Sequence, residues 1–245
     1  MDNLIALVTG ANKGIGKEIA RQLAAAGHTV YVGSRDAVRG KDAVADIGGD
    51  TRLLVLDVAD AESVAAAARQ VPALDILVNN AGISPSEGTL VTDEDVDTFR
   101  RVYETNVFGV VAVTNAFLPA LRRSAHPRIV NMSSGTASLA ASAGHAEGTI
   151  AFTGRPSGTF GAYRSSKTAL NELTVLYANA LAEDGFKVNA LAPGLRRTDL
   201  NDTARTSPSA GDPAEGAAGA VRLALLPDDG PTGGYFSWNG NPVPW

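Results

Sequence analysis

Short apolar runs alternate with longer stretches of helical periodicity along this chain. The apolar runs have the length of buried strands, and we expect strands at residues 4–8, 29–32, 53–56, 76–78, 128–132, 188–191 and 235–237. Apolar positions three and four residues apart predict helices between them, at 15–26, 39–47, 61–70, 94–121, 163–182 and 213–225. Asp212 followed by Pro213 is a typical start of the last helix. The alternation indicates βαβ units.

This order of elements predicts an α/β fold in which right-handed crossovers join parallel strands. We expect a single domain over residues 1–245, with a Rossmann-type, doubly wound, mainly parallel seven-stranded sheet and helices on both faces. Two stretches, 135–161 and 195–211, have no regular periodicity and follow strand ends. Because such sheets bind ligands at the carboxyl ends of their strands, we expect these stretches to form a substrate pocket. Two mobile surface loops are the alternative.

The composition is that of a globular chain, since 44% of the 245 residues are apolar and 19% are charged. The net charge of −5 argues against nucleic acid or an anionic membrane surface as a partner. There is no cysteine, and His28, His126 and His145 are too scattered for a metal site, so we expect no metal. The N-terminal segment lacks the pattern of a signal peptide, so we expect a cytoplasmic protein.

The first expected strand ends in a glycine-rich turn that leads directly into a helix, Thr9-Gly10-Ala11-Asn12-Lys13-Gly14-Ile15-Gly16. Glycines let the backbone approach a pyrophosphate closely, and the free N–H groups and positive dipole end of the helix favour its charge. The turn therefore predicts a dinucleotide site, although its spacing is GxxxGxG instead of GxGxxG. A turn that only lets a strand pack closely on a helix is the alternative.

The end of the second expected strand, Gly33-Ser34-Arg35-Asp36, should meet the adenosine ribose of a dinucleotide. Arg35 and Lys13 can pair with the 2′-phosphate of NADP, whereas Asp36 can accept hydrogen bonds from the ribose hydroxyls of NAD. Ser34 at the strand end, followed by Arg35, favours NADP(H), and Asp36 leaves NAD(H) open. A solvated Arg35–Asp36 pair at the start of the next helix is the alternative.

Tyr163 and Lys167 are four residues apart at the start of an expected helix, so their side chains share one face. An ammonium near a phenol favours the phenolate and lowers the pKa of the tyrosine, which suits proton exchange with an alcohol or carbonyl oxygen. The same pair is compatible with an amphipathic helix that carries a snorkelling lysine.

Several motifs occur together in one order, namely the turn from Thr9 to Gly16, Asp57, Asn79-Asn80-Ala81-Gly82, Asn106, Ser133-Ser134, Tyr163-Arg164-Ser165-Ser166-Lys167, and Pro193-Gly194 followed by Thr198. With these motifs the chain resembles the short-chain dehydrogenase/reductase family over essentially its whole length. Lys13, Arg35, the long segment before Tyr163 and the tail at 230–236 are similar to its carbonyl-reductase-like, NADP(H)-preferring branch.

The resemblance implies four catalytic residues. Tyr163 would be the proton donor in reduction, and Ser134 would hold and polarise the substrate oxygen. Lys167 would lower the pKa of Tyr163 and bind the nicotinamide ribose, while Asn106 would anchor a water molecule of the proton relay. Asn79 would stabilise the sheet instead of binding the nucleotide.

The resemblance also implies a cofactor site. Asp57 and the backbone of Val58 would bind adenine, residues 80–82 would line the adenosine ribose, and the backbone after Pro193, with Thr198, would hold the nicotinamide carboxamide. The full set of expected cofactor residues is Gly10, Asn12, Lys13, Gly14, Ile15, Gly16, Arg35, Asp57, Val58, Asn80, Ala81, Gly82, Tyr163, Lys167, Pro193, Gly194 and Thr198.

Two departures from the family pattern affect the expected pocket. The segment 135–161 exceeds that of short family members by roughly a dozen residues. In relatives with larger insertions it covers a helix face used for dimerisation, so a monomer and a homo-oligomer, dimer or tetramer, are both left open. In the lid at 195–211, Arg196 or Arg197 can engage an acidic group of the substrate, or both can be solvated.

These observations favour an NADPH-dependent enzyme that reduces an aldehyde or ketone, a small-molecule substrate, by hydride transfer to carbon and proton transfer from Tyr163 to oxygen. An NAD(P)-dependent secondary-alcohol dehydrogenase working in the oxidative direction is the first alternative, because Asp36 permits NAD. A non-catalytic, nucleotide-sensing regulator is more remote, since all four catalytic positions carry the family residues.

Overall fold

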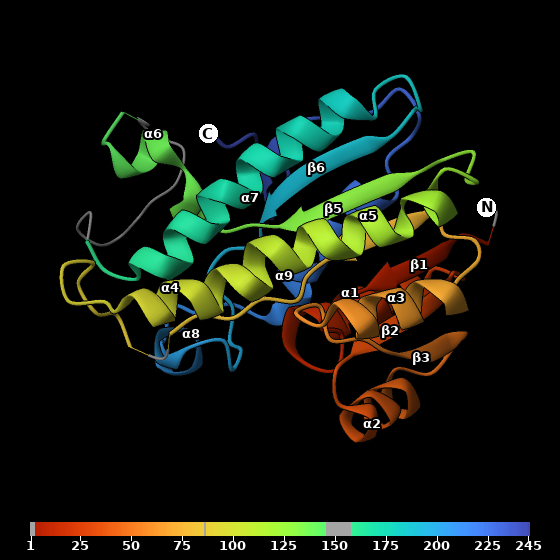
Figure 1. The fold of residues 1–245 in the computed structure, drawn as a ribbon, viewed down its shortest axis with the longest axis horizontal. Coiled ribbons are helices and arrows are strands. Elements are labelled where there is room, and N and C mark those ends of the chain that lie inside the picture. Colours follow the sequence, from red (N-terminus) through yellow and green to blue (C-terminus); the bar gives the residue numbers. More distant parts are fainter. Residues whose placement is uncertain (1–2, 86, 146–157) are drawn as a thin grey trace.

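The computed structural model describes residues 3–85, 87–145 and 158–245, which form a three-layer α/β fold around one sheet (Figure 1). The sheet has seven parallel strands in the order β3-β2-β1-β4-β5-β6-β7. In chain order the strands are β1(Ile5–Val8), β2(Thr29–Ser34), β3(Thr51–Val55), β4(Ile76–Asn79), β5(Arg128–Met132), β6(Lys187–Ala192) and β7(Tyr235–Ser237). The predicted fold class is therefore confirmed, and each strand lies within two residues of its expected position.

The central strands are buried on both faces, which explains why they were visible as short apolar runs. All residues of β4 and β5 are buried, and Ala6, Leu7 and Val8 of β1 have no exposed surface. Strands β1 and β4, where the order of strands reverses, pair Ala6 with Ile76 and Val8 with Val78. Their carboxyl ends consequently open at the same edge of the sheet, where such folds bind ligands.

Helices cover both faces of the sheet. Three of them, α1(Gly14–Ala25), α2(Ala37–Ile47) and α9(Pro213–Ala224), share one hydrophobic core with the sheet. On the opposite face, α3(Ala61–Gln70), α5(Gly109–Leu121) and α7(Gly161–Ala180) share a second core, and Figure 1 shows these three in front of the strands. The expected start of α9 is confirmed, because the Asp212 carboxylate accepts a hydrogen bond from the Ala214 N–H at 2.8 Å.

The single helix expected at 94–121 is wrong. The chain forms α4(Val96–Tyr103), a π-helical turn η1(Glu104–Phe108) and then α5. A π-turn inserts one extra residue into the helical ladder and rotates the side chains that follow it. Here it carries Asn106, whose side chain bonds the backbone of Ile83 in the loop after β4. Periodicity alone does not report such an insertion, because both flanking helices continue the apolar pattern.

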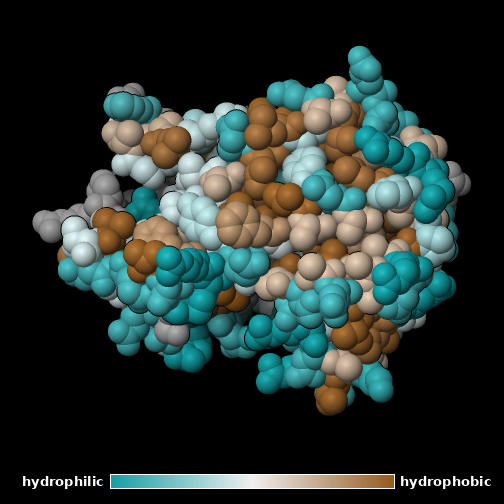
Figure 2. Space-filling model, viewed as in Figure 1, coloured by the Kyte–Doolittle hydropathy of each residue, from teal (hydrophilic) through white to brown (hydrophobic). Residues whose placement is uncertain are grey.

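The two irregular stretches contain short elements that the sequence pattern did not predict. They are the 3-10 turn η2(Gly135–Ala137), α6(Leu139–Ser142) and α8(Asp202–Thr206). The expected pocket wall at 135–161 is described only outside residues 146–157. No described helix has the length and apolarity required to span a membrane. On the face shown in Figure 2, polar residues spread over α4 and α8, while apolar residues gather over α7 and, in a smaller group, over α2.

A buried chain of side-chain amides and hydroxyls links the sheet to α5 and α7. The Asn79 side chain at the end of β4 donates to Thr114 on α5 at 3.1 Å and to the Asn131 carbonyl on β5 at 2.9 Å. Asn131 in turn donates to Thr174 on α7 at 2.9 Å. All four side chains are buried. The structure thus agrees with the expectation that Asn79 stabilises the sheet.

We expect Asn79→Ala to lower the free energy of unfolding by about 1–3 kcal/mol, because it leaves buried partners on Asn131 and Thr114 without a hydrogen bond. Urea unfolding followed by circular dichroism measures the change. Gln70→Ala, which removes an exposed amide that bonds only its own helix, is the control and should change the free energy by less than about 0.5 kcal/mol. Equal effects of both substitutions would contradict a stabilising role of the buried hydrogen-bonded side chains.

Candidate functional site

A cleft of about 420 Å³ opens at the carboxyl edge of the sheet. Segments far apart in the sequence line it: the turn after β1, the end of β2, the loops after β3 and β4, the first turns of α7, and the segment after β6. The expected cofactor residues that line the cleft are Gly10, Asn12, Lys13, Gly14, Ile15, Gly16, Arg35, Asp57, Val58, Asn80, Ala81, Gly82, Tyr163, Lys167, Pro193 and Thr198. Gly194 is the one expected cofactor residue that does not line the cleft.

The glycine turn has the backbone shape that a pyrophosphate site requires. Gly10 and Gly14 adopt left-handed conformations, with φ of 62° and 56°. A Cβ on Gly16 would lie 2.3 Å from the amide nitrogen of Asn80 and 2.7 Å from the carbonyl oxygen of Gly10. Lys13 precedes α1 without capping it, so no side chain of this residue competes for the N–H groups of the first helical turn. These features fit an anionic ligand at the start of α1.

Thr9 and Asn80 fasten the glycine turn to the loop after β4. The Thr9 hydroxyl accepts hydrogen bonds from the N–H groups of Asn80 and Ala81, both at 2.9 Å. The Asn80 side chain donates to the carbonyl oxygen of Thr9 at 2.8 Å. Asn80 therefore shapes the turn as well as lining the cleft, a role that its place after a strand does not reveal.

Charged side chains gather where the cleft meets the end of β2. The cleft is lined there by Lys13, Arg35, Asp36 and Arg39. Sequence analysis missed Arg39, although it lies four residues from Arg35, a spacing that places two side chains on one face of a helix.

Asp36, just after β2, caps helix α2. Its carboxylate accepts hydrogen bonds from the N–H groups of Val38 and Arg39, at 2.9 and 3.0 Å, and so caps α2. The backbone N–H of Arg39, first among several contacts, lowers the pKa of Asp36. The Ser34 hydroxyl donates to the carbonyl oxygen of Asp36 at 2.8 Å and fixes this corner. Both capping bonds use Oδ1, and Oδ2 lies 3.5 Å from the Arg39 guanidinium, so each oxygen of this carboxylate already has a partner.

Asp57 and Val58 follow β3 on the same side of the cleft. The Asp57 carboxylate accepts the N–H of Ala59 at 3.0 Å, and its own N–H donates to the Ser63 hydroxyl at 2.9 Å. Val58 packs against Gly109, where a Cβ would come within 2.9 Å of the valine methyl group. The loop is thus held in one conformation by α3 and α5, as a wall for a planar group requires.

The first two turns of α7 carry Tyr163 and Lys167 at the other end of the cleft. The Lys167 ammonium is buried, donates to the carbonyl oxygen of Met132 at 2.8 Å, and lies 5.9 Å from the centre of the Tyr163 ring. Burial lowers the pKa of Lys167 to about 8. At neutral pH the ammonium therefore still carries its proton.

The expected lowering of the Tyr163 pKa by Lys167 is not found. Burial raises the pKa of the Tyr163 hydroxyl, and a hydrogen bond with the Ser134 side chain offsets only part of this effect. The phenol is thus protonated at neutral pH. Tyr163 is half-buried and lines the cleft, and a protonated hydroxyl beside a second hydroxyl is suited to proton donation there.

The two serines after β5 have different environments. The Ser133 hydroxyl donates to the Asn171 carbonyl on α7 at 2.6 Å and is turned into the protein. The Ser134 hydroxyl bonds the Thr136 hydroxyl at 2.9 Å. Tyr235 of β7 donates its hydroxyl hydrogen to the backbone carbonyl of Ser134 and stacks on Trp245 at 5.2 Å between ring centres. Sequence analysis missed this support behind Ser134, because the two residues are distant in sequence.

Asn106 joins the cluster from the π-turn. Its amide group donates to the Ser166 hydroxyl on α7 at 3.0 Å and to the carbonyl oxygen of Ile83 at 2.9 Å. A Cβ on Gly82 would lie 3.3 Å from both the Asn106 side-chain oxygen and the Lys167 nitrogen. Of the four expected catalytic residues, Tyr163 and Lys167 line the cleft, whereas Asn106 and Ser134 do not. Asn106 is fully buried behind the cleft, next to Thr105, and Ser134 follows Ser133, which is part of the lining.

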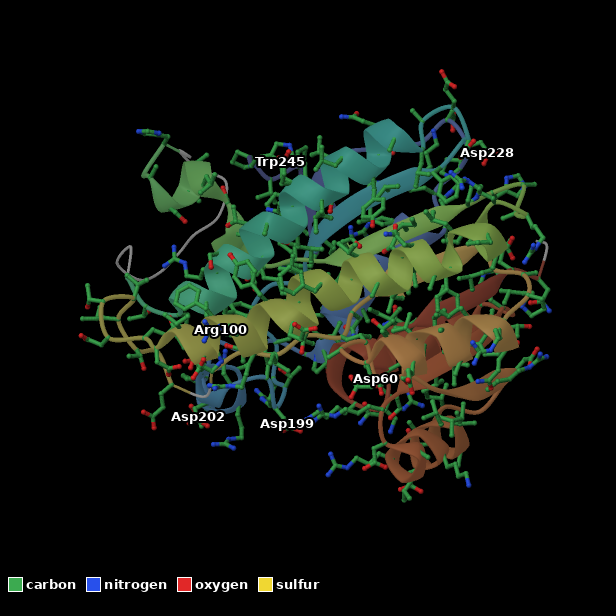
Figure 3. All side chains as sticks on the ribbon, in the orientation of Figure 1. Asp60, Arg100, Asp199, Asp202, Asp228 and Trp245 are labelled. Carbon is green, nitrogen blue, oxygen red and sulfur yellow. The ribbon has the colours of Figure 1, made fainter. Side chains whose placement is uncertain are left out.

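The lid segment after β6 lies over the glycine turn. A Cβ on Gly14 would touch the Thr198 methyl group at 3.4 Å, and the Lys13 ammonium is 3.3 Å from the Asp199 carboxylate. Figure 3 shows Asp199 beside α8, on the side that faces the N-terminal half of the sheet. Lys13 and Asp199 are both more than half exposed, so their contact is a weak one.

Arg196 does not meet the cleft. Its guanidinium is 5% exposed, forms an ion pair with Glu215 on α9, donates to the carbonyl oxygen of Pro193 at 2.6 Å and lies 4.3 Å from the centre of the Trp238 ring. The possibility that it binds an acidic substrate group is therefore wrong. Arg197 is exposed and contacts the carbonyl oxygen of Ala210 at 3.4 Å.

Comparisons with known proteins agree with this geometry. The family model described as short chain dehydrogenase matches residues 4–209. The (+)-neomenthol dehydrogenase of Arabidopsis thaliana is 35% identical, with 95% of each chain covered. The NADPH-bound carbonyl reductase from chicken fatty liver is 27% identical with a TM-score of 0.83 over 100% of each chain. The 3-ketoacyl-(acyl-carrier-protein) reductase from Brucella melitensis, complexed with NADH, is 25% identical with a TM-score of 0.81 over 96% of each chain.

We expect Asp199→Asn to tighten binding of an NAD(P)H dinucleotide by about fivefold at most, because it frees the Lys13 ammonium from an exposed ion pair. Fluorescence titration gives the Kd. Asp202→Asn, which removes a carboxylate that pairs with Arg205 on α8, is the matched control and should leave the Kd unchanged. Weaker binding by the Asp199 variant would contradict the competition for Lys13.

Proposed function

Because the chain belongs to the short-chain dehydrogenase family, we propose that it reduces an aldehyde or ketone to an alcohol with NADPH. It is an NAD(P)-dependent oxidoreductase that acts on a carbonyl or an alcohol. The observation that carries the proposal is that Tyr163 and Lys167 line one end of a cleft whose opposite end fits a dinucleotide phosphate. Ser134 is hydrogen-bonded to Tyr163, and Asn106 supports the same helix through Ser166.

In the proposed mechanism the chain supplies the proton and the orientation. The bound nicotinamide supplies the hydride for the carbonyl carbon. Ser134 donates a hydrogen bond to the carbonyl oxygen, which polarises it, and Tyr163 donates its hydroxyl proton to the same oxygen as negative charge develops there. Lys167, anchored on Met132, binds the nicotinamide ribose hydroxyls, and Asn106 holds the π-turn against α7.

The direction of reaction is proposed from the state of Tyr163. Reduction needs a protonated phenol, whereas oxidation of an alcohol needs a phenolate that accepts the proton. Burial raises the pKa of Tyr163, so the protonated form is the resting form at neutral pH. The resting site can therefore donate a proton in reduction at neutral pH, whereas oxidation of an alcohol through the same residue would need a higher pH.

The preference for NADPH is proposed from the charges at the end of β2. Lys13, Arg35 and Arg39 supply three cations beside the expected position of the adenosine ribose. The only carboxylate that could replace them as a ribose ligand at that strand end, Asp36, is engaged as the cap of α2. A 2′-phosphate would therefore find partners there, whereas an unmodified ribose would compete with Arg39 for the Asp36 carboxylate.

The substrate is proposed to be uncharged near its carbonyl group. Ile83 and Leu200 line the cleft with their aliphatic side chains, and Arg196 is occupied by Glu215. An apolar wall favours an apolar ligand. The match to a neomenthol dehydrogenase agrees with a small cyclic ketone or alcohol as a first choice for assays.

The proposed activity is tested by following the loss of NADPH absorbance, with NADH in parallel, against aldehydes, diketones and bulkier cyclic ketones. We expect reduction of at least one carbonyl compound, with NADPH preferred. Tyr163→Phe should lower kcat by roughly 10²- to 10⁴-fold, because it removes the proton donor, and should leave the Kd for NADPH nearly unchanged. Full turnover in that variant would exclude the mechanism, and tight NADPH binding without any turnover would favour a nucleotide sensor.

We expect Lys13→Ala and Arg35→Ala each to weaken NADPH binding by roughly tenfold or more and NADH binding by much less, because each removes a cation that faces the 2′-phosphate. Titration with both nucleotides measures the ratio of the two Kd values. Arg52→Ala, which removes a cation paired with Asp50 away from the cleft, is the matched control. Equal losses for NADH and NADPH would contradict the proposed preference.

A further inference from the structure

Helix α7, which carries Tyr163 and Lys167 in its first two turns, begins without a local cap. Its N-cap residue is Phe160, whose side chain cannot accept a hydrogen bond. Phe160 also has φ of 58°, the left-handed region, and no other described non-glycine residue has a positive φ. For a bulky side chain this conformation is costly and persists only where neighbouring contacts impose it. The start of α7 is therefore held from outside the helix.

Glu94, in the loop before α4, provides the missing cap. Its carboxylate oxygen Oε2 accepts a hydrogen bond from the Ala162 N–H at 3.1 Å. Ala162 is the second residue of α7, a position that an N-cap side chain normally bonds. The carboxylate also lies at the positive end of the helix dipole. Glu94 thus does for α7 what Asp36, Asp60 and Asp212 do for their own helices, but from 68 residues away.

A short ribbon holds Glu94 against α7. We call this ribbon the clamp; it consists of residues 88–94 and 158–162. The Val91 N–H donates to the Gly158 carbonyl at 2.7 Å, the Phe160 N–H donates to the Thr89 carbonyl at 3.1 Å, and Leu90 pairs with Thr159 in an antiparallel bridge. Figure 1 shows the segment that leads into α4 beside the first turn of α7.

Two glycines give the clamp its close fit. A Cβ on Gly88 would lie 2.6 Å from the Phe160 ring, and a Cβ on Gly161 would lie 2.9 Å from Oε2 of Glu94. The ring of Phe160 and the carboxylate of Glu94 therefore occupy places that only glycine neighbours leave open. The clamp fixes both the left-handed turn at Phe160 and the cap on Ala162.

One oxygen of the Glu94 carboxylate is buried in a way that destabilises the folded state. Its second oxygen, Oε1, is inaccessible to solvent and has no hydrogen-bond partner in the part of the chain that the structure describes. An unpaired buried carboxylate oxygen disfavours the folded state. Such a cost is typical of groups that serve the geometry of a functional site.

We propose that Glu94 is a positioning residue for the reaction: through the Ala162 N–H it fixes the first turn of α7 and so places the Tyr163 hydroxyl beside Ser134. The inference rests on the proposed function, because it assigns to Glu94 a part in the geometry of proton donation. Glu94 is proposed to contact neither substrate nor cofactor. Its effect is therefore expected on kcat and not on nucleotide binding.

The test compares Glu94→Ala with Glu94→Gln in the full chain. Hydrogen exchange, read by mass spectrometry on peptides that cover 161–167, reports the first turn without any substrate. We expect Glu94→Ala to speed this exchange by roughly five- to tenfold, because the cap is lost. Glu94→Gln should restore most of the protection, since its amide oxygen can accept the same N–H.

Kinetics use a carbonyl compound that the unmodified protein reduces with NADPH. We expect Glu94→Ala to lower kcat by roughly ten- to a hundredfold, because a small displacement of the donor is costly, while KM and the Kd for NADPH change by less than about twofold. Glu94→Gln should recover most of kcat. If Glu94→Ala does not fold, Glu94→Asp, whose carboxylate is one methylene short of Ala162, replaces it.

Asp95→Ala is the matched control, because it removes the neighbouring carboxylate, which caps α4 through the Thr98 N–H at 2.7 Å. It should leave kcat close to that of the unmodified protein. Unchanged exchange in Glu94→Ala, faster exchange with unchanged kcat, failure of Gln to rescue, or an equal loss of kcat in the Asp95 variant would each overturn the proposal. If no carbonyl compound is reduced at all, the proposed function fails, and the exchange data alone then decide whether Glu94 orders α7.

Discussion

The hydrogen-bonded chain from Thr114 through Asn79 and Asn131 to Thr174 determines where the chemistry can occur. It fastens the ends of β4 and β5 to α5 and α7 inside the apolar core, where water cannot replace a lost partner. Because α7 carries Tyr163 and Lys167, this hydrogen-bonded network fixes the position of both side chains relative to the strand ends. The buried amides between the sheet and the helices, and not the residues that line the cleft, thus set the position of the cleft.

Three of the four residues proposed for catalysis are held by partners that have no proposed part in the reaction. Lys167 is anchored on the Met132 carbonyl, Ser134 is supported by Tyr235, and Asn106 is bound to Ile83. These partners come from β5, β7 and the loop after β4, so three parts of the chain must be folded before the site exists. Such preorganisation lowers the cost of aligning donor and acceptor during the reaction.

Sequence patterns predicted the strands and the glycine turn, because buried parallel strands appear as apolar runs and glycine positions follow from close approach. The roles of Asn106, Ser134, Tyr163 and Lys167 came from the resemblance to the family and remain a proposal. They failed where the structure depends on neighbours that are distant in sequence. The π-turn at Asn106 breaks no apolar pattern, and the buried state of Arg196 depends on Glu215 and Trp238. The raised pKa of Tyr163 depends on how far the folded protein shields its hydroxyl from water, which spacing along a helix does not report.

The cap on α7 also has a consequence for how the protein folds. The first turn of α7 depends on a contact between residues 68 positions apart. The glycine turn has the same requirement, because the Thr9 hydroxyl accepts the N–H of Asn80, 71 positions further along the chain. Contacts of such long sequence separation form slowly, so neither end of the cleft is complete until the segment after β4 has folded. The protein would then acquire its ability to bind and its ability to react at the same stage of folding.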